Sequence, residues 1–239
     1  MAKRTTKSTT KPSLFKRILI TFGKVLLWFV LFSVIWVLAY RFINPPITPL
    51  MVQRNWERSE KDLPAKADRK WVKFENISDN MKRAAVSAED QLFLQHMGFD
   101  IKAIEKAYAN NAKGKKVKGG STISQQTAKN VFLWPGRSYI RKGFEAYFTL
   151  LIELLWSKER ILEVYLNVIE MGDGIYGAEA ASKAYYGSSC ETMTKGEASL
   201  LAACFPNPRR WTPNKATAYI RHRQSLILRN MRRLGPLDF

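Results

Sequence analysis

A long apolar run near the N-terminus most constrains how this chain can fold. Residues 25–40, VLLWFVLFSVIWVLAY, carry no charge, and ILITFG before them extends the apolar stretch back to Ile18, interrupted only by Lys24. About 20 apolar residues cross the hydrocarbon core of a bilayer, and a lysine near one end of a span can reach the headgroups. The stretch 18–40 is therefore predicted to be a transmembrane anchor.

A cleavable signal peptide is the alternative interpretation of this run. It is disfavoured because LAYRFINPP, rather than a small-residue cleavage site, follows the apolar residues. Residues 1–24 contain seven Lys or Arg and no acidic residue, so the positive-inside rule places the N-terminus in the cytoplasm. The predicted organisation is a cytoplasmic basic tail (1–17), an anchor (18–40), a linker (41–70) and an external domain (71–239).

The charge balance indicates a polyanionic partner. The chain has 39 Lys and Arg against 20 Asp and Glu, a net charge of +19. Nucleic acid is disfavoured because the domain lies across a membrane, which leaves an anionic lipid or a lipid-linked phosphate. Two cysteines and two histidines exclude a zinc finger or a disulfide-stapled small fold. A Cys190–Cys204 disulfide is the alternative to the favoured interpretation of two buried thiols.

The external domain is predicted to be mainly α-helical. Residues 41–75 contain four prolines and are expected to be irregular. Capping residues then precede successive helical patterns. The expected N-caps are Asp79, Asp100, Thr122, Ser138, Ser157, Thr194 and Asn214, and the expected helices are 80–96, 101–112, 123–132, 139–156, 158–170, 196–205 and 215–234.

The first chemical signal is EDQLFLQHMG, residues 89–98. On a helix, Glu89, Phe93 and His96 would share one face. A carboxyl group among apolar neighbours has its pKa raised by desolvation, which suits a general base or acid. A solvated helix end is the alternative interpretation.

The second and third signals are cationic. In GGSTISQQTAKN, residues 119–130, glycines lead into a helix N-terminus that favours an anion, and Gln126 and Lys129 point the same way. In RKGFE, residues 141–145, Lys142 and Glu145 form either a surface ion pair or part of a phosphate site with Arg137. The fourth stretch, KERILEVYLN, is predicted to be mainly structural.

These four stretches, in this order, closely resemble the motifs of glycosyltransferase family 51, the glycosyltransferases of peptidoglycan synthesis. GDGIYGAEAASKAYYG (172–187) and ASLLAACFPNPRRWTPN (198–214) continue the pattern. The resemblance covers about residues 70–215. A single anchor without a transpeptidase domain points to the monofunctional biosynthetic peptidoglycan transglycosylase branch.

The resemblance implies a mainly α, lysozyme-like fold with a head lobe and a membrane-dipping jaw lobe. It implies polymerisation of lipid II into β-1,4 glycan strands, with inversion at the donor anomeric carbon and release of undecaprenyl pyrophosphate. Glu89 would be the general base, and Glu145 would lie near the pyrophosphate and a candidate divalent cation, Mg²⁺ or Mn²⁺. The implied substrate-binding residues are Asp90, Phe93, His96, Ser121, Thr122, Gln126, Lys129, Arg137 and Lys142.

The resemblance also predicts location and partners. The chain would be a single-pass protein of the bacterial inner membrane with a periplasmic catalytic domain. Its substrates would be lipid II and a lipid-linked glycan strand, with cell-division or cell-wall synthesis proteins as candidate partners. Two other functions are the alternatives: a membrane-anchored murein hydrolase or lytic transglycosylase, and a non-enzymatic scaffold that would tolerate loss of Glu89.

One apolar segment has two interpretations. Residues 131–135, VFLWP, lie just before Arg137. They either pack in the core or dip into the outer leaflet beside the cations Lys113, Lys115, Lys116 and Lys118. Insertion into the outer leaflet is the hypothesis for this segment.

Overall fold

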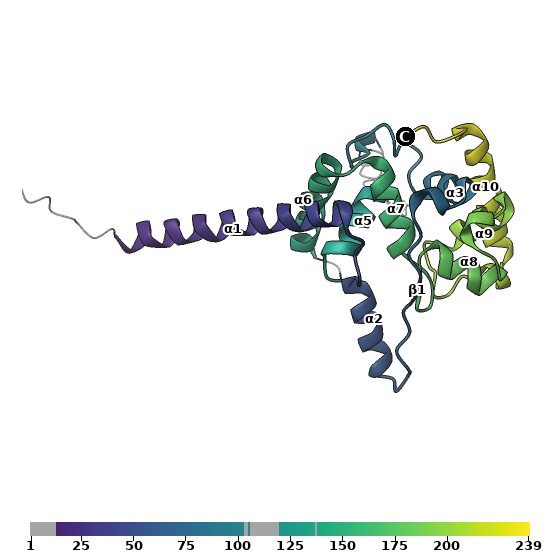
Figure 1. The fold of residues 1–239 in the computed structure, drawn as a ribbon, viewed down its shortest axis with the longest axis horizontal. Coiled ribbons are helices and arrows are strands. Elements are labelled where there is room, and N and C mark those ends of the chain that lie inside the picture. Colours follow the sequence, from purple (N-terminus) through teal and green to yellow (C-terminus); the bar gives the residue numbers. More distant parts are fainter. Residues whose placement is uncertain (1–12, 103–104, 106–119, 137) are drawn as a thin grey trace, which may run out of the picture.

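The structure is a computed structural model that describes residues 13–102, 105, 120–136 and 138–239 (Figure 1). Most of the predicted helix 101–112 lies outside the described residues. Arg137 and the four lysines between 113 and 118 also lie outside them.

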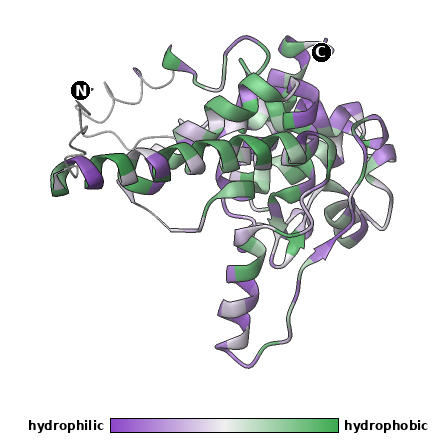
Figure 2. Cartoon of the chain, turned by 60° about the vertical axis from the view of Figure 1, so that its left-hand side comes forward, coloured by the Kyte–Doolittle hydropathy of each residue, from purple (hydrophilic) through white to green (hydrophobic). Residues whose placement is uncertain are grey.

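A single long helix, α1 (Leu14–Phe42), contains the whole predicted anchor. It begins after Ser13, whose side chain accepts a hydrogen bond from the backbone N–H of Lys16. Within the described residues it is the one helix long and apolar enough to cross a membrane. Figure 2 shows that α1 is hydrophobic along most of its length, and its N-terminal part projects away from the domain. Exposed apolar side chains on a projecting helix are what a membrane-spanning segment requires.

The C-terminal part of α1 is clamped to the domain. The indole Nε1 of Trp156 donates a hydrogen bond to the carbonyl oxygen of Val37 at 2.8 Å. The guanidinium of Arg160 donates to the carbonyl oxygens of Tyr40 at 2.9 Å and Ile43 at 3.0 Å. The carbonyls of Tyr40 and Ile43 lie at the end of the helix, where no intrahelical donor remains for them. The anchor therefore continues into the domain without a flexible joint.

The segment after the anchor is more ordered than predicted. Helix α2 (Pro49–Ser59) lies within residues 41–75, so the expectation of an irregular linker was wrong for this part. Proline is tolerated at the first helical position, where its missing N–H would be unpaired anyway. Thr48 caps the helix by accepting from the N–H of Met51 at 3.3 Å.

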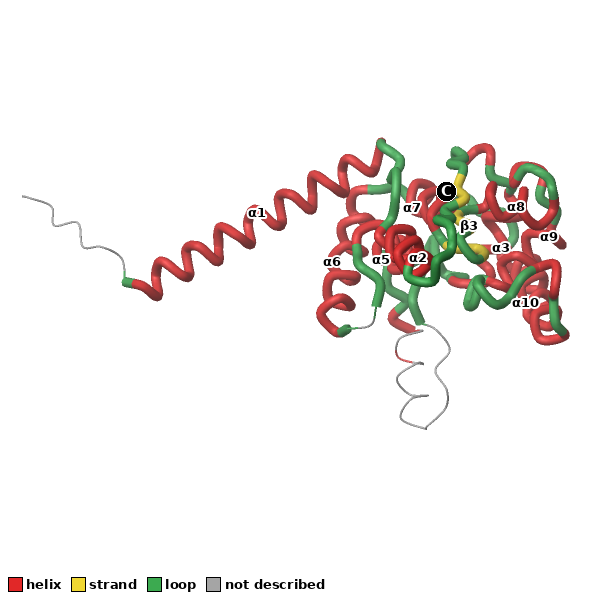
Figure 3. The backbone as a smooth tube through the Cα atoms, turned by 90° about the horizontal axis from the view of Figure 1, so that it is seen from below, coloured by secondary structure: helices red, strands yellow, loops and turns green. Residues whose placement is uncertain are grey.

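The remaining elements form two groups of helices and a small sheet (Figures 1 and 3). In one group, α3, α9 and α10 pack together, with α8 beside them; in the other, α5 packs between α6 and α7, and α1 lies against α6. The helices are α3 (Asp79–Glu89), α5 (Ile123–Phe132), α6 (Tyr139–Leu155), α7 (Lys158–Val168), α8 (Ala178–Tyr186), α9 (Lys195–Cys204) and α10 (Ala218–Leu234), with short 3₁₀ helices at Phe74–Asn76, Cys190–Thr192 and Pro213–Lys215. This mainly α, two-lobed arrangement agrees with the predicted fold class.

The sheet connects the linker to the hairpin of the GDGIYG stretch. Its strands are β1 (Asp68–Arg69), β2 (Glu170–Gly172) and β3 (Ile175–Tyr176), in the order β1-β3-β2. β1 runs parallel to β3, and β2 runs antiparallel to it.

Most predicted helix starts are confirmed. Thr122 with Gln125 and Thr194 with Glu197 form complete capping boxes, and Ser138 and Ser157 cap α6 and α7. Three details were wrong. The cap of α3 is Ser78 rather than Asp79, the cap of α10 is Thr217 rather than Asn214, and α3 ends at Glu89 rather than near His96.

The two cysteines are free and buried, so the predicted pair of thiols is confirmed and the disulfide is not formed. Burial raises the pKa of Cys190 to about 12 and that of Cys204 to about 11. Thiols with such pKa values are poorly ionised and unreactive near neutral pH.

The VFLWP segment is divided between the core and the surface. Phe132 is 6% exposed and Trp134 is 50% exposed. The ring of Phe132 stacks on Phe148 with centroids 4.8 Å apart and meets the ring of Trp36 on α1 edge-on. Val131 and Leu133 are buried as well. The hypothesis that the whole segment dips into the leaflet was therefore wrong for these three residues, and only Trp134 remains available for it.

Candidate active site

Glu89 is the last residue of α3 and lies where the two lobes meet. Its Oε2 accepts a hydrogen bond from Nε2 of Gln126 on α5 at 2.8 Å. Burial raises the pKa of Glu89, while the hydrogen bond from Gln126 and the charges of Arg223 and Lys129 oppose this rise. A desolvated carboxylate with a raised pKa is a stronger base than a solvated one and can accept a proton from a hydroxyl group.

Asp90 connects the lobes structurally. The backbone of Asp90 leaves the helical conformation, and its carboxylate accepts from the N–H of Ile123 at 3.0 Å and bonds Nε2 of His96 at 2.9 Å. Ile123 is the first residue of α5. The anion that the sequence predicted at this helix N-terminus is thus the protein's own carboxylate, which interacts favourably with the helix dipole.

His96 and Phe93 support this turn. Nδ1 of His96 accepts from the N–H of Gly98 at 3.1 Å, so the ring proton lies on Nε2 and is donated to Asp90. Phe93 is completely buried, with the ammonium of Lys158 4.6 Å from its ring centroid. The prediction that Glu89, Phe93 and His96 share a helix face was wrong, because the helix ends where Asp90 turns toward α5.

Lys158 and Glu153 hold the far end of the turn. The ammonium of Lys158 donates to the carbonyl oxygen of His96 at 2.7 Å and to Glu153 at 2.8 Å. The hydroxyl of Ser124 also donates to Glu153. The fourth motif is therefore structural at Lys158, as predicted.

Gly98 is required by its backbone conformation and by its neighbours. Its φ is +81°, and an added Cβ would lie 2.6 Å from Cγ2 of Thr149. We expect Gly98→Ala to lower the free energy of unfolding by about 2–3 kcal/mol, because strain and overpacking add. Urea unfolding measures this loss.

Gly187→Ala is the matched control for Gly98→Ala. Gly187 also has a positive φ, +71°, but an added Cβ would have no atom within 4 Å. The control should lose only about 1 kcal/mol, the cost of the left-handed conformation alone. Equal losses in the two variants would show that the contact with Thr149 is unimportant.

Glu145 lies between two cations on α6. Its side chain is 3% exposed, and it accepts hydrogen bonds from Arg141 at 2.9 Å and from Lys142. Lys142 itself is 49% exposed. The surface ion-pair interpretation was therefore wrong, because the carboxylate is buried even though one cation reaches solvent. A pocket of about 400 Å³ beside this cluster is lined by Ser138, Tyr139, Arg141 and Lys142.

Lys129 extends the cationic region onto α5. Burial lowers its pKa, Arg141 and Lys142 lower it further, and Glu145 opposes the change. Lys129 also lines a pocket of about 220 Å³ with Leu50 and Arg54 of α2 and with Leu133 and Trp134. Cations and apolar side chains therefore occur together beside Lys129.

The arrangement around Glu145 does not fit a resident metal ion. Both carboxylate oxygens accept hydrogen bonds from cations. The part of the chain that the structure describes contains no group of three or more His, Cys, Asp or Glu suited to a metal. The divalent cation expected from the sequence stays a prediction, and a Mg²⁺ or Mn²⁺ ion would need phosphate oxygens as its main ligands.

The structure brings together most of the predicted site residues. Gln126, Lys129, Lys142 and Glu145 surround the junction between α3, α5 and α6, Thr122 is buried as a cap, and Ser121 is half-buried at the start of α5. Arg137 lies outside the described residues. The motifs left two residues out of the site: Arg141 and Arg223. The spacing of Arg141 four residues before Glu145 was a signal, whereas Arg223 comes from a distant helix and gave none.

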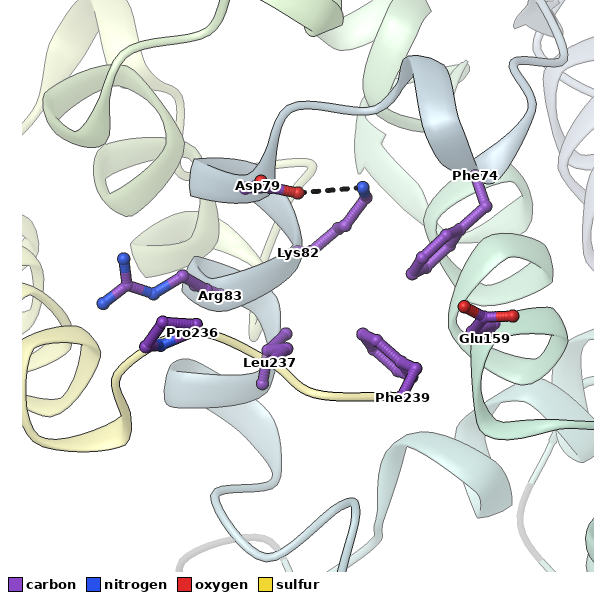
Figure 4. A pocket seen from close by; sticks show the side chains of 8 residues that line it. All are labelled: Phe74, Asp79, Lys82, Arg83, Glu159, Pro236, Leu237 and Phe239. Carbon is purple, nitrogen blue, oxygen red and sulfur yellow. Dashed lines mark hydrogen bonds and ion pairs between the residues drawn. The ribbon is translucent and has the colours of Figure 1, made fainter.

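A further pocket, of about 400 Å³, lies away from this site (Figure 4). It opens between the first turns of α3 and the C-terminal segment, and Asp79 pairs with Lys82 at 3.0 Å beside Phe74 and Phe239. It contains none of the predicted site residues.

Cations grouped around a second carboxylate distinguish a glycan transferase from a glycan hydrolase. A hydrolase has no anionic leaving group to neutralise, whereas a transferase that expels a pyrophosphate benefits from preorganised cations. With its lysozyme-like architecture, this site therefore defines a glycosyltransferase.

The chain belongs to the transglycosylase family, whose family model matches residues 57–232. It is 47% identical over 226 residues to the biosynthetic peptidoglycan transglycosylase of Pseudomonas fluorescens strain Pf-5, covering 95% of this chain and 92% of the relative. It is 46% identical over 220 residues to the protein of the same name from Stutzerimonas stutzeri strain A1501, covering 92% and 91%. The family predicted from the motifs is thereby confirmed, and the chain is an enzyme of this family.

Proposed function

We propose that the protein polymerises lipid II into peptidoglycan glycan strands. The observation that carries the proposal is that the half-buried carboxylate of Glu89, whose pKa is raised by desolvation, and the cations around Glu145 lie at one junction. A glycosyl transfer from a lipid pyrophosphate needs both parts, a base for the acceptor and positive charge for the leaving group. The names of the relatives support peptidoglycan as the product.

In the first half of the reaction, Glu89 takes the proton of the acceptor sugar hydroxyl. Gln126 fixes the carboxylate by its hydrogen bond. Asp90, His96 and Phe93 hold the turn that follows Glu89, so their role is to position the base. The hydroxyl oxygen attacks the donor anomeric carbon from the face opposite the pyrophosphate, which gives inversion and a β-1,4 bond.

In the second half, the bond from the anomeric carbon to the pyrophosphate oxygen breaks. Lys129, Arg141 and Lys142 supply positive charge for the leaving oxygens, and Glu145 keeps Arg141 and Lys142 in place. The apolar wall of the pocket next to Lys129, made by Leu50, Leu133 and Trp134, suits the first carbons of a polyprenyl chain. No step in this scheme uses a metal ion.

The test is incubation of the purified full chain with labelled lipid II, followed by lysozyme digestion of the product. Polymer that lysozyme cleaves to disaccharide-peptides is the expected result. A chain that leaves lipid II unchanged and instead cleaves preformed strands would be a murein hydrolase, and the proposal would be wrong.

The pH dependence of the reaction tests the role of Arg223. Its positive charge lowers the pKa of Glu89, so Arg223→Gln should raise that pKa. Because the base must be ionised, the acidic limb of the kcat/KM profile should then move to higher pH. Arg223→Lys keeps the charge and should move the limb less. An unchanged limb in Arg223→Gln would mean that Glu89 does not control it.

The proposed location is the bacterial inner membrane, with residues 1–17 in the cytoplasm and the domain in the periplasm. Helix α1 and the cations at residues 1–24 support this orientation. Trp134 and the exposed Tyr139 and Ile140 at the start of α6 are suited to contact the bilayer surface.

Trp134 and Phe132 should respond oppositely to substitution by serine. Phe132→Ser should lower the free energy of unfolding by about 3 kcal/mol, because it empties a buried aromatic site. Trp134→Ser should change it by less than about 0.5 kcal/mol and should reduce contact with lipid. Thermal unfolding and quenching of tryptophan fluorescence by brominated lipids measure the two effects. Unchanged quenching in Trp134→Ser would place this side chain in water.

A further inference from the structure

Helix α10 lies in a part of the domain whose charges are all of one sign. Residues 198–237 contain eight Lys or Arg and no Asp or Glu. Four arginines of α10 are exposed: Arg221, Arg229, Arg232 and Arg233. Together they are called here the α10 arginine face.

The arginine face is opposite to the side of α10 that packs in the core. Ile220, Ile227 and Met231 are the buried residues of this helix. Arg221, Arg229 and Arg232 recur at i, i+8 and i+11, so they share one side. The helix dipole accounts for cations in the last turn, which contains Arg232 and Arg233. It does not account for Arg221 in the first turn.

These charges are not neutralised by the part of the chain that the structure describes. Among the described residues, none of the four arginines forms an ion pair with a carboxylate. The guanidinium of Arg221 donates a hydrogen bond to the neutral side chain of Gln224 at 3.2 Å. Like charges held on one face repel each other, so an anionic partner would stabilise the arrangement.

The position of α10 argues against the anchoring membrane as that partner. Figures 1 and 3 place α10 at the end of the molecule opposite to the free part of α1. The attraction of an anionic bilayer falls off within a Debye length, about 8–10 Å. The same helix carries Arg223, whose charge acts on Glu89. Arg223 lies near the buried side of α10, so the helix itself joins the catalytic junction to the exposed arginine face on its other side.

We infer that the α10 arginine face binds the carboxylate groups of the peptides on the glycan strand as the strand leaves the site. The inference rests on the proposed function, since it takes its ligand from the polymer made at Glu89. A polymer with carboxylates at regular intervals matches a row of exposed guanidinium groups, each of which can bind a carboxylate with two hydrogen bonds.

The experiment measures binding of soluble, uncrosslinked glycan strands that carry their peptides to the full chain in zwitterionic nanodiscs. Neutralising the face with Arg221→Gln, Arg229→Gln, Arg232→Gln and Arg233→Gln together should weaken binding about tenfold at low salt. The quadruple Arg→Lys variant keeps the charge and is the matched control, which should lose much less. Wild-type protein should bind strands whose carboxylates have been converted to amides as weakly as the Gln variant binds untreated strands.

Three results would overturn the inference. The first is unchanged strand binding in the Gln variant. The second is wild-type protein that binds amidated strands as tightly as untreated strands. The third is a Gln variant that loses binding to phosphatidylglycerol vesicles but not to strands. Strand binding requires no turnover, so it is independent of whether the protein consumes lipid II. Failure of the lipid II assay would disprove the proposed function, whereas these results would disprove only the role of α10.

Discussion

Glu89→Gln should abolish polymerisation while leaving the fold intact. The amide has nearly the same shape as the carboxylate but cannot accept the hydroxyl proton, and loss of a general base typically costs about 10²–10⁴-fold in rate. Gln126, which donates to Glu89 at 2.8 Å, can still donate to the amide oxygen of the variant. Consumption of labelled lipid II measures the rate.

Two controls make this result specific. The melting temperature of Glu89→Gln should equal or exceed that of the wild type, because burial disfavours the ionised carboxylate at this position. Glu75→Gln removes an exposed carboxylate on the 3₁₀ helix Phe74–Asn76 and should keep full activity. A folded Glu89→Gln protein with more than about a tenth of the wild-type rate would exclude Glu89 as the base.

Arg141→Met should damage both stability and activity. Among the residues that the structure describes, it leaves the buried carboxylate of Glu145 with one ion-pair partner, the half-exposed Lys142. Removing one member of a buried ion pair costs about 3–5 kcal/mol, and the loss of a cation at the leaving group should lower kcat/KM by about 10²-fold or more. Urea unfolding and the lipid II assay measure the two effects.

The double variant Arg141→Met with Glu145→Met separates the two effects. Replacing both members of a buried pair by apolar residues is often neutral for stability, so the double variant should regain most of the lost free energy. It should stay inactive, because the cation is still missing. Recovery of activity together with stability would mean that Arg141 acts only through the fold.

Local sequence signals predicted the helices well, because capping and apolar periodicity are short-range. The boxes at Thr122–Gln125 and Thr194–Glu197 are examples. The local signals failed at Glu89. The helical pattern of the sequence continues to His96, but the helix ends at Glu89. The reason is tertiary: the carboxylate of Asp90 finds the N-terminus of α5, a partner 33 residues away. Local helix propensity cannot predict an interaction between residues that lie so far apart in the sequence.

The candidate site shows the same limit. The residues of each motif could be predicted, but their partners across the lobes could not. For Glu145 the sequence left a surface pair with Lys142 open as an alternative, because its burial depends on the packing of α6 rather than on its spacing. Arg223 acts on Glu89 from another element, more than 130 positions along the chain. For Phe132 the sequence left both the core and the membrane open, because it did not show that Trp36 of α1 packs against this ring.

The clamp that Trp156 and Arg160 form on the end of α1 has a consequence for how substrate is found. With α1 in the bilayer, the catalytic junction is held at a fixed height above the headgroups. A lipid-borne substrate then searches for the site by lateral diffusion in two dimensions, at a high effective concentration. The orientational entropy of the domain is lost once, when the chain folds onto its own anchor, and not again at each encounter.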